Sequence, residues 1–427
     1  MGHALVVAFF ILIFSGMPIA YVLGITGVAA LLIMGTVPLK VLPQMMWVSL
    51  DSFPLMALPF FILAGEIMNH SGITKSLIDM SKLMVGRYKG GLAYTSIVAS
   101  TFFASISGSA SATAAAVGGM LIPPMVDEGY DKNFTGATIT AASVVGPIIP
   151  PSTSMVILAV TAGLSVGGLF LAGYIPGILF SCGLMFYVRY KAHKYNFPTC
   201  ELKLTRREKY DAFKYSLPAL FMPLIILGGI LGGIFTATEA AAMACVYGIF
   251  IGFFYTKTLK FKSLPQMFIR TAVITAAIDL ILATSNILGW SMTVFQIPQQ
   301  ITEYFLSLST NPYVILFLIN ILLLIMGCFM EIVVTIVMLS PILFPLITQL
   351  GIHPLHFGIV MIFNLCLGMA TPPLGLSLFV CCGIAKTTIE GITREIWPMI
   401  LVAIAVLMLI TYCPIVSMFI PKIFGLY

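Results

Sequence analysis

The sequence contains very little charge. Only 8% of its 427 residues are Asp, Glu, Lys or Arg, 60% are hydrophobic, and the mean hydropathy is +1.08. A soluble globular domain carries about 25% charged residues, so the composition excludes that class. Apolar runs long enough to cross a hydrocarbon core of about 30 Å recur from residue 4 to residue 418. We therefore predict an all-α polytopic membrane protein.

Catalytic and metal-binding patterns are missing as well. The eight cysteines show no C-x-x-C spacing and lie mostly in apolar runs, which is typical of small buried hydrophobes. His353 and His356 flank a proline, but no third ligand is near them in sequence, which argues against a transition-metal site. The acidic residues are isolated rather than paired for acid-base chemistry. We therefore expect neither an enzyme nor a nucleic-acid-binding protein.

The two halves of the chain repeat each other weakly at an offset of 222 residues. The tetrapeptide "LPQM" at 42–45 recurs at 264–267, and the Pro-Pro pair at 150–151 recurs at 372–373. Other matches also fall on prolines and glycines, the residues that interrupt regular backbone. Transporter folds are often built from two such halves. The offset therefore predicts an internal structural repeat.

The distribution of basic residues indicates that the two repeats are inverted. The most polar stretch, 189–214, carries eight basic and three acidic residues, and the positive-inside rule places it in the cytoplasm. Residues 75–89 carry four basic residues, whereas their repeat-mates at 297–311 carry none. Equivalent loops are thus expected on opposite sides of the membrane, as in an inverted-topology repeat.

These patterns divide the chain into two repeats joined by a linker and one extra span. Each repeat is expected to hold a re-entrant hairpin with arms of about 14 residues, too short to cross, and a discontinuous helix. The predicted parts are the first repeat (1–190, hairpin 92–125, broken helix 134–163), the cytoplasmic linker (191–214), the extra span (215–236) and the second repeat (237–427, hairpin 312–347, broken helix 356–385).

The two proline pairs carry the predicted chemistry. "VVGPIIPPST" (144–153) and "GMATPPLGLS" (368–377) interrupt apolar crossings, and their prolines free carbonyls that lipid cannot satisfy. Such carbonyls suit Na⁺, and the half-helix that begins after each break offers free N–H groups to an anion. The first hairpin tip, "SISGSASAT" (105–113), adds five hydroxyls, for which close packing of small residues is the alternative explanation. Glu331 at the second tip either binds a cation or caps the following arm.

Several long stretches resemble one transporter family. "DSFPLMALPFFILAGEIMN" (51–69), "FFASISGSASATAAAVGGMLIPPM" (102–125), "GYDKNFTGATITAASVVGPIIPPS" (129–152) and "GIFTATEAAA" (233–242) are similar to the large membrane subunit of tripartite ATP-independent periplasmic (TRAP) transporters. The resemblance covers nearly the whole chain. It implies Na⁺-driven uptake of an organic acid, such as a C4-dicarboxylate, sialic acid or sugar acid, across a bacterial inner membrane. A small membrane subunit and a periplasmic substrate-binding protein are the implied partners.

Matched by position, the resemblance also implies three sets of site residues. The first Na⁺ site would use Ser107, Gly108, Ser109, Gly146, Ile149 and Pro151. The second Na⁺ site would use Gly327, Glu331, Gly368, Thr371 and Pro373. The substrate would lie between them, near Ser111, Thr113, Ser152, Thr153, Thr335 and Gly375. Many relatives carry an acid where this chain has Thr113, so the role of that charge does not transfer.

The implied mechanism is an elevator, in which a hairpin-bearing domain shifts against a scaffold. We expect the spans near 4–32, 168–256 and 395–420 to form that scaffold, and the small subunit to be a separate chain. The alternative is a stand-alone Na⁺-coupled carboxylate carrier of related fold that needs no binding protein. Hairpins entering from both sides favour alternating access over a continuous pore.

Overall fold

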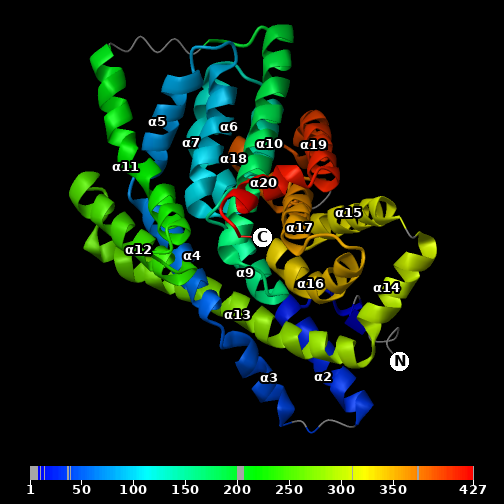
Figure 1. The fold of residues 1–427 in the computed structure, drawn as a ribbon. Helices are drawn as coiled ribbons and strands as arrows, with labels where there is room; N and C mark the ends of the chain where they lie inside the picture. The colour runs from blue at the N-terminus through cyan, green and yellow to red at the C-terminus, as the bar shows by residue number, and fades with distance from the viewer. Residues whose placement is uncertain are drawn as a thin grey trace.

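The computed structural model describes residues 8–9, 11–13, 15–35, 38, 40–199, 206–309, 311–372 and 375–426. Every regular element in these ranges is helical, and one isolated β-bridge joins Lys89 to Thr199. Eight helices of this part are long and apolar enough to cross a membrane. The predicted all-α class with many apolar helices is therefore confirmed (Figure 1).

The helices of the first half are α2 (Ile19–Met34), α3 (Val41–Leu50), η1 (Phe53–Met56), α4 (Ala57–His70), α5 (Ile73–Val85), α6 (Gly91–Ser107), α7 (Ala110–Asp127), α8 (Lys132–Ser143), α9 (Thr153–Ala162) and α10 (Val166–Lys194). Those of the second half are α11 (Arg206–Leu231), α12 (Ala237–Phe250), η2 (Ile251–Tyr255), η3 (Phe261–Ser263), α13 (Leu264–Val294), α14 (Ile297–Leu308), α15 (Pro312–Phe329), α16 (Ile332–Gln349), α17 (Pro354–Gly368), α18 (Leu376–Ala385), α19 (Ile389–Tyr412) and α20 (Ile415–Ile423).

Two consecutive helices lie at each predicted hairpin, and they are longer than the predicted arms; that the hairpins are re-entrant stays a prediction. The arms α6 and α7 have 17 and 18 residues, and α15 and α16 have 18 each, so the estimate of 14 is wrong. The hydroxyl-rich sequence lies mostly within the helices, where its side chains bond the backbone of the preceding turn: Ser105 Oγ donates to Phe102 O at 2.6 Å and Thr113 Oγ1 to Ser109 O at 2.7 Å. The first turn shrinks to Gly108 and Ser109, where Gly108 adopts φ 59°.

The discontinuous helices lie where the proline pairs predict them. The helix α8 ends at Ser143, and α9 begins at Thr153 after the proline-containing segment. In the second half, α17 ends at Gly368 and α18 begins at Leu376. Helix starts also follow the repeat: α7 begins at Ala110 and α16 at Ile332, 222 residues later. The inversion of the repeats across a membrane stays a prediction.

Two sets of helix contacts can be described, and they are joined where α5 packs on α6, α4 packs on α6 and α9, and α13 packs on α16. In the first, α6, α7 and α8 pack together, α18 lies on α7 and α8, α16 on α9, and α17 on α15. In the second, α2 and α3 lie along α13, the long helix that crosses the lower half of Figure 1, and α12 lies along α4. The helices α10 and α19 pack on the hairpin-bearing helices, α10 on α6 and α19 on α8, and their assignment to a scaffold stays a prediction. Gly173 and Gly177 let α10 approach the break between α8 and α9 at Ile148 and Ile149.

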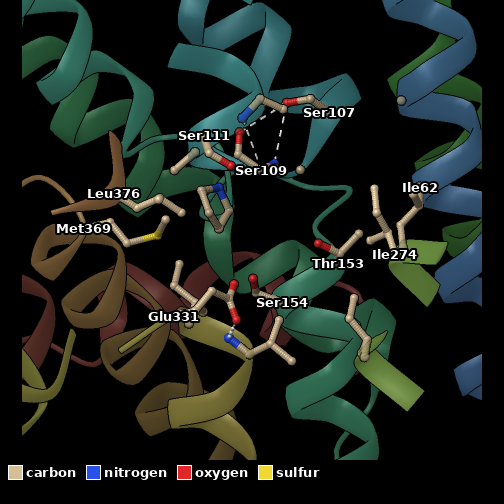
Figure 2. A pocket seen from close by; sticks show the side chains of 18 of the residues that line it. Ile62, Ser107, Ser109, Ser111, Thr153, Ser154, Ile274, Glu331, Met369 and Leu376 are labelled. Carbon is tan, nitrogen blue, oxygen red and sulfur yellow. Dashed lines mark hydrogen bonds between the residues drawn. The ribbon is translucent and has the colours of Figure 1, made fainter. Parts of the chain in front are cut away.

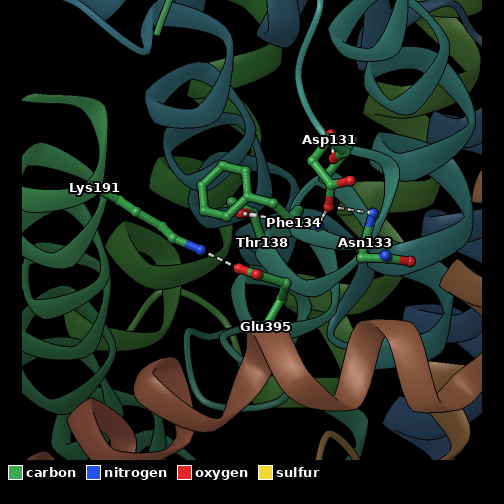
Figure 3. A network of polar contacts seen from close by, with 7 residues as sticks. Asp131, Asn133, Phe134, Thr138, Lys191 and Glu395 are labelled. Atoms are coloured by element: carbon green, nitrogen blue, oxygen red, sulfur yellow. Dashed lines mark hydrogen bonds and ion pairs between the residues drawn. The ribbon is translucent and has the colours of Figure 1, made fainter. Parts of the chain in front are cut away.

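A polar cluster ties one end of the first set of helices together. Lys191 of α10 forms an ion pair with Glu395 of α19, and its ammonium lies 5.0 Å from the centre of the Phe134 ring on α8 (Figure 3). Asp131 caps α8 by accepting from the N–H groups of Asn133 at 3.0 Å and Phe134 at 2.9 Å. These contacts join α8, α10 and α19, which are separated in sequence.

Two helix boundaries differ from the expected spans. The run near 4–32 is interrupted, since α2 begins only at Ile19, after Gly16 with φ 81° and the N-cap Pro18. Both ends of the predicted linker 191–214 are helical, because α10 continues to Lys194 and α11 begins at Arg206. Basic side chains are favourable in the last turn of a helix, which explains why α10 continues through them.

Candidate functional site

A cavity of about 430 Å³ lies where the hairpin tips and the helix breaks meet (Figure 2). Residues of the first tip and α9 face residues of the second tip across it, and α4 and α13 form another wall. The lining residues are Ile62, Gly65, Glu66, Asn69, Ser107, Gly108, Ser109, Ala110, Ser111, Ala112, Pro147, Thr153, Ser154, Ile274, Ile278, Glu331, Ile332, Val333, Met369 and Leu376.

Four helices begin at this cavity. The first residues of α7, α9, α16 and α18 are all in its lining. Side chains cap three of these starts: Ser109 accepts from Ala112 N–H at 3.4 Å, Ser152 from Met155 N–H at 3.3 Å, and Glu331 from a backbone N–H of α16 at 2.8 Å. The cavity thus collects the positive ends of four helix dipoles.

The first hairpin tip holds its hydroxyls in a small network. Ser107 Oγ lies 3.0 Å from Thr113 Oγ1, and Ser109 Oγ lies 3.3 Å from Ser111 Oγ. Figure 2 shows Ser109 and Ser111 on one side of the cavity and Glu331 on the opposite side. Hydrogen bonds between these hydroxyls therefore orient the oxygen atoms that the tip presents to the cavity.

The structure brings most of the first predicted Na⁺ set together. A Cβ atom on Gly146 would lie 2.6 Å from Ser109 O, and one on Gly108 would lie 2.7 Å from Pro151 O, so the tip and the break touch through backbone alone. The carbonyls of residues 146–151 accept no hydrogen bond from any described donor. The side chain of Ile149 turns away and packs against Gly177 of α10, contributing no polar atom.

The second predicted set is assembled similarly but is more fully bonded. A Cβ on Gly327 would lie 3.0 Å from Leu365 O and 3.2 Å from Gly368 Cα. Gly368 O accepts from Thr371 N–H at 2.9 Å. Glu331 accepts from Val333 N–H at 2.8 Å, which is the geometry of the capping alternative. Pro373 lies outside the described residues.

Two of the six predicted substrate residues, Ser111 and Thr153, line the cavity. The other four lie behind the lining, where they stabilise helix starts. Thr113 and Thr335 are fully buried, and their hydroxyls donate to the backbone. Ser152 and Gly375 are the N-caps of α9 and α18.

The prediction missed the wall formed by α4 and α13. Ile62, Glu66 and Asn69 lie one turn apart on α4, and Ile274 and Ile278 are likewise one turn apart on α13. The helical spacing of these residues marks one face of each helix, but nothing in the spacing says that the face meets the hairpins. Glu66 is one of the isolated acidic residues of the sequence, and its spacing gives it no predicted partner.

Comparison with known proteins identifies the family. The family model described as "Tripartite ATP-independent periplasmic transporter, DctM component" matches residues 6–416. The isethionate TRAP transporter permease protein DctMQ of Oleidesulfovibrio alaskensis is 40% identical over 95% of this chain and 64% of its own length. The C4-dicarboxylate TRAP transporter large permease protein DctM of Rhodobacter capsulatus is 37% identical, over 97% of each chain. The sialic acid TRAP transporter large permease protein SiaM of Vibrio cholerae is 36% identical, over 97% of this chain and 96% of its own.

The fold also has a counterpart among solved structures. The crystal structure of the YdaH transporter of Alcanivorax borkumensis matches with a TM-score of 0.65, covering 87% of this chain and 88% of that chain at 15% identity. These relatives are transporter permeases rather than enzymes, as the absence of paired catalytic groups predicted. The chain belongs to the DctM component family of the tripartite ATP-independent periplasmic transporters.

Proposed function

We propose that this subunit takes up an organic acid anion across the bacterial inner membrane, coupled to Na⁺, by an elevator mechanism. Relatives named for C4-dicarboxylates, sialic acid and isethionate handle carboxylates or a sulfonate, so the proposed substrate carries one of these acid groups. The isethionate relative widens the class beyond the carboxylates expected from the sequence.

The convergence of four helix starts on one cavity is the observation that carries this proposal. The described lining contains no Lys or Arg, so an acid group there would be bound by backbone N–H groups and by hydroxyls such as Ser111 and Thr153. Helix N-termini bind anions in this way because their first N–H groups lack partners in the helix. A cavity of about 430 Å³ also fits a small organic acid.

Coupling to Na⁺ is supported by the oxygen atoms beside the cavity. The carbonyls of residues 146–151 have no hydrogen-bond donor among the described residues, and Pro147, Pro150 and Pro151 remove three potential donors from that segment. Carbonyl oxygens freed at a broken helix are hard ligands suited to Na⁺. We propose the first tip with this break, and the second tip with its own break, as the two cation sites.

We propose that the hairpin-bearing helices move against the set that contains α2, α3, α12 and α13. We propose that the hairpins are re-entrant, that the repeats are inverted, and that the linker 191–214 is cytoplasmic. The partners would be a periplasmic binding protein and a small membrane subunit. This chain matches only 64% of the DctMQ relative, and we assign the remainder of that relative to the small subunit.

The test is uptake into proteoliposomes that contain this chain with its small subunit, with the binding protein outside. Labelled succinate, N-acetylneuraminate and isethionate form the substrate panel, and K⁺ replaces Na⁺ in the control. Uptake of one acid that stops without Na⁺ and without the binding protein is expected. Uptake that continues in K⁺ would contradict the coupling, and uptake without the binding protein would favour the stand-alone carrier.

A further inference from the structure

The charges around the cavity pose a problem for an anion carrier. Two carboxylates, Glu66 and Glu331, line the cavity, and no described basic residue does. Glu331 is engaged at the start of α16, where it accepts from Val333 N–H. Glu66 stands on the α4 wall and is 18% exposed, so its negative charge repels an acid group unless a nearby cation balances it.

Arg270 supplies that cation from the neighbouring helix. Its Nη1 lies 3.8 Å from Glu66 Oε2, and its side chain is 61% exposed. On α13, Arg270 comes one turn before Ile274, which lines the cavity, so the guanidinium sits at the edge of the cavity rather than inside it. His70 is also close, with Nδ1 3.9 Å from Glu66 Oε2, and Nδ1 donates to Glu66 O at 2.9 Å.

Asn69 provides an unused polar group beside this pair. It lines the cavity three residues after Glu66, on the same face of α4. Its Oδ1 is buried and has no hydrogen-bond partner among the described residues. A buried amide oxygen accepts hydrogen bonds and cannot bind an acid group, so the amide N–H₂ of Asn69 is the group that could donate to one.

The surface around this edge is basic. The end of α4 packs on the loop before α13, because a Cβ on Gly72 would lie 3.1 Å from the Thr258 side chain. That loop carries Lys257, Lys260 and Lys262, and all three are exposed. An anion that leaves the cavity past Arg270 therefore enters a surface of positive charge.

We propose that Asn69 and Arg270 form an exit subsite for the carboxylate or sulfonate group of the substrate, and that Glu66 holds Arg270 when this subsite is empty. The proposal rests on the proposed function. Arg270 offers a planar set of donors that matches an acid group, and Asn69 adds an amide. Glu66 competes with the anion for the same guanidinium. The anion is therefore released from Arg270 when Glu66 pairs with it again, and it does not stay bound there.

The test uses proteoliposomes of the complete complex, with the binding protein outside so that only correctly oriented complexes are loaded. The rate of exchange of labelled substrate is measured while the substrate concentration inside or outside the vesicles is varied. The substrate is whichever of succinate, N-acetylneuraminate or isethionate the wild type transports. Arg270→Gln is expected to raise the half-saturating internal concentration at least tenfold, with less than a twofold change in the external one. Glu66→Gln is expected to lower the internal value severalfold, because Arg270 is then always available.

Lys132→Gln on α8 is the matched control, since it removes one exposed charge outside this basic surface and should leave both values unchanged. If Arg270→Gln lowers the melting temperature, the double variant Glu66→Gln with Arg270→Gln is used, because it leaves no unpaired carboxylate. The same tenfold rise in the half-saturating internal concentration is expected. An unchanged internal value in these variants, or equal rises on both sides, overturns the exit subsite. A wild type that transports none of the three acids contradicts the proposed function instead, so the two failures are distinct.

Discussion

Gly146→Ala tests whether the contact between the first hairpin tip and the broken helix forms a cation site. Gly146 lies in the segment between α8 and α9, where a Cβ would lie 2.6 Å from Ser109 O, 2.7 Å from Ser109 C and 2.9 Å from Ala110 N. All three atoms belong to the backbone, so no side chain can rotate away. The added methyl group must therefore push the tip and the break apart.

The size of the effect follows from these distances. Ordinary contact begins at 3.4 Å, so the tip has to retreat by about 0.8 Å, and overpacking of this kind costs about 1–3 kcal/mol. If that cost falls on the cation-bound state, the Na⁺ concentration for half-maximal uptake rises by about 5- to 150-fold. Folding is less affected, because the empty tip can relax without a ligand to coordinate.

The assay is the Na⁺ dependence of uptake in proteoliposomes, with thermal unfolding measured in parallel. Gly119→Ala is the control, because Gly119 lies on an exposed face of α7 and a Cβ there meets nothing within 4 Å. That substitution should raise helix stability by up to about 1 kcal/mol and leave the Na⁺ dependence unchanged. A folded Gly146→Ala variant with the wild-type Na⁺ dependence would refute the reasoning.

Three further substitutions test individual contacts. Lys191→Met leaves the carboxylate of Glu395 without its partner and should lower the free energy of unfolding by about 2 kcal/mol. A double variant with Glu395→Leu should regain part of this stability. An unchanged melting temperature of Lys191→Met would contradict a stabilising role of the ion pair. Ser109→Ala removes the cap of α7, worth about 1 kcal/mol, and an oxygen of the first tip, so the Na⁺ affinity measured by uptake should fall; a loss of stability alone would limit Ser109 to capping. Pro151→Ala restores a backbone donor at the break and should reduce Na⁺-dependent uptake more than it reduces the melting temperature, whereas equal losses would indicate a purely structural proline.

The two breaks could be predicted because their signal is local: a Pro-Pro pair beside glycine in the middle of an apolar crossing lies just before the starts of α9 and α18. Proline alone would not have been enough, since Pro123 and Pro124 lie inside α7 without ending it. The arm lengths could not be read in the same way. Residues such as Ser105 and Thr113 look like turn residues in sequence, yet they lie within helices, where their hydroxyls donate to carbonyls of the preceding turn.

The same distinction between local signals and long-range packing applies to the candidate site. The resemblance to the family placed Gly146 and Ser109 in one set, and the structure explains the glycine, because a Cβ there would lie 2.6 Å from Ser109 O. Glu66 and Asn69 could not be predicted, because their helix could face lipid, a partner or the cavity, and only long-range packing decides between these. The neighbours of α10 could not be predicted for the same reason, since its apolar sequence is compatible with packing on either set of helices.

The two hairpin tips share a backbone role but differ in charge. Ser109 caps α7 and Glu331, 222 residues later, caps α16, so the repeat keeps an acceptor at the same helix position. One acceptor is a neutral hydroxyl and the other is a carboxylate. Under the proposed function, an acid group in the cavity is repelled from the Glu331 side and attracted to the starts of α7 and α9, where Ser111 and Thr153 face it. The repeat therefore places the two tips in equivalent positions. The difference between serine and glutamate then orients the bound substrate, with its acid group toward the starts of α7 and α9.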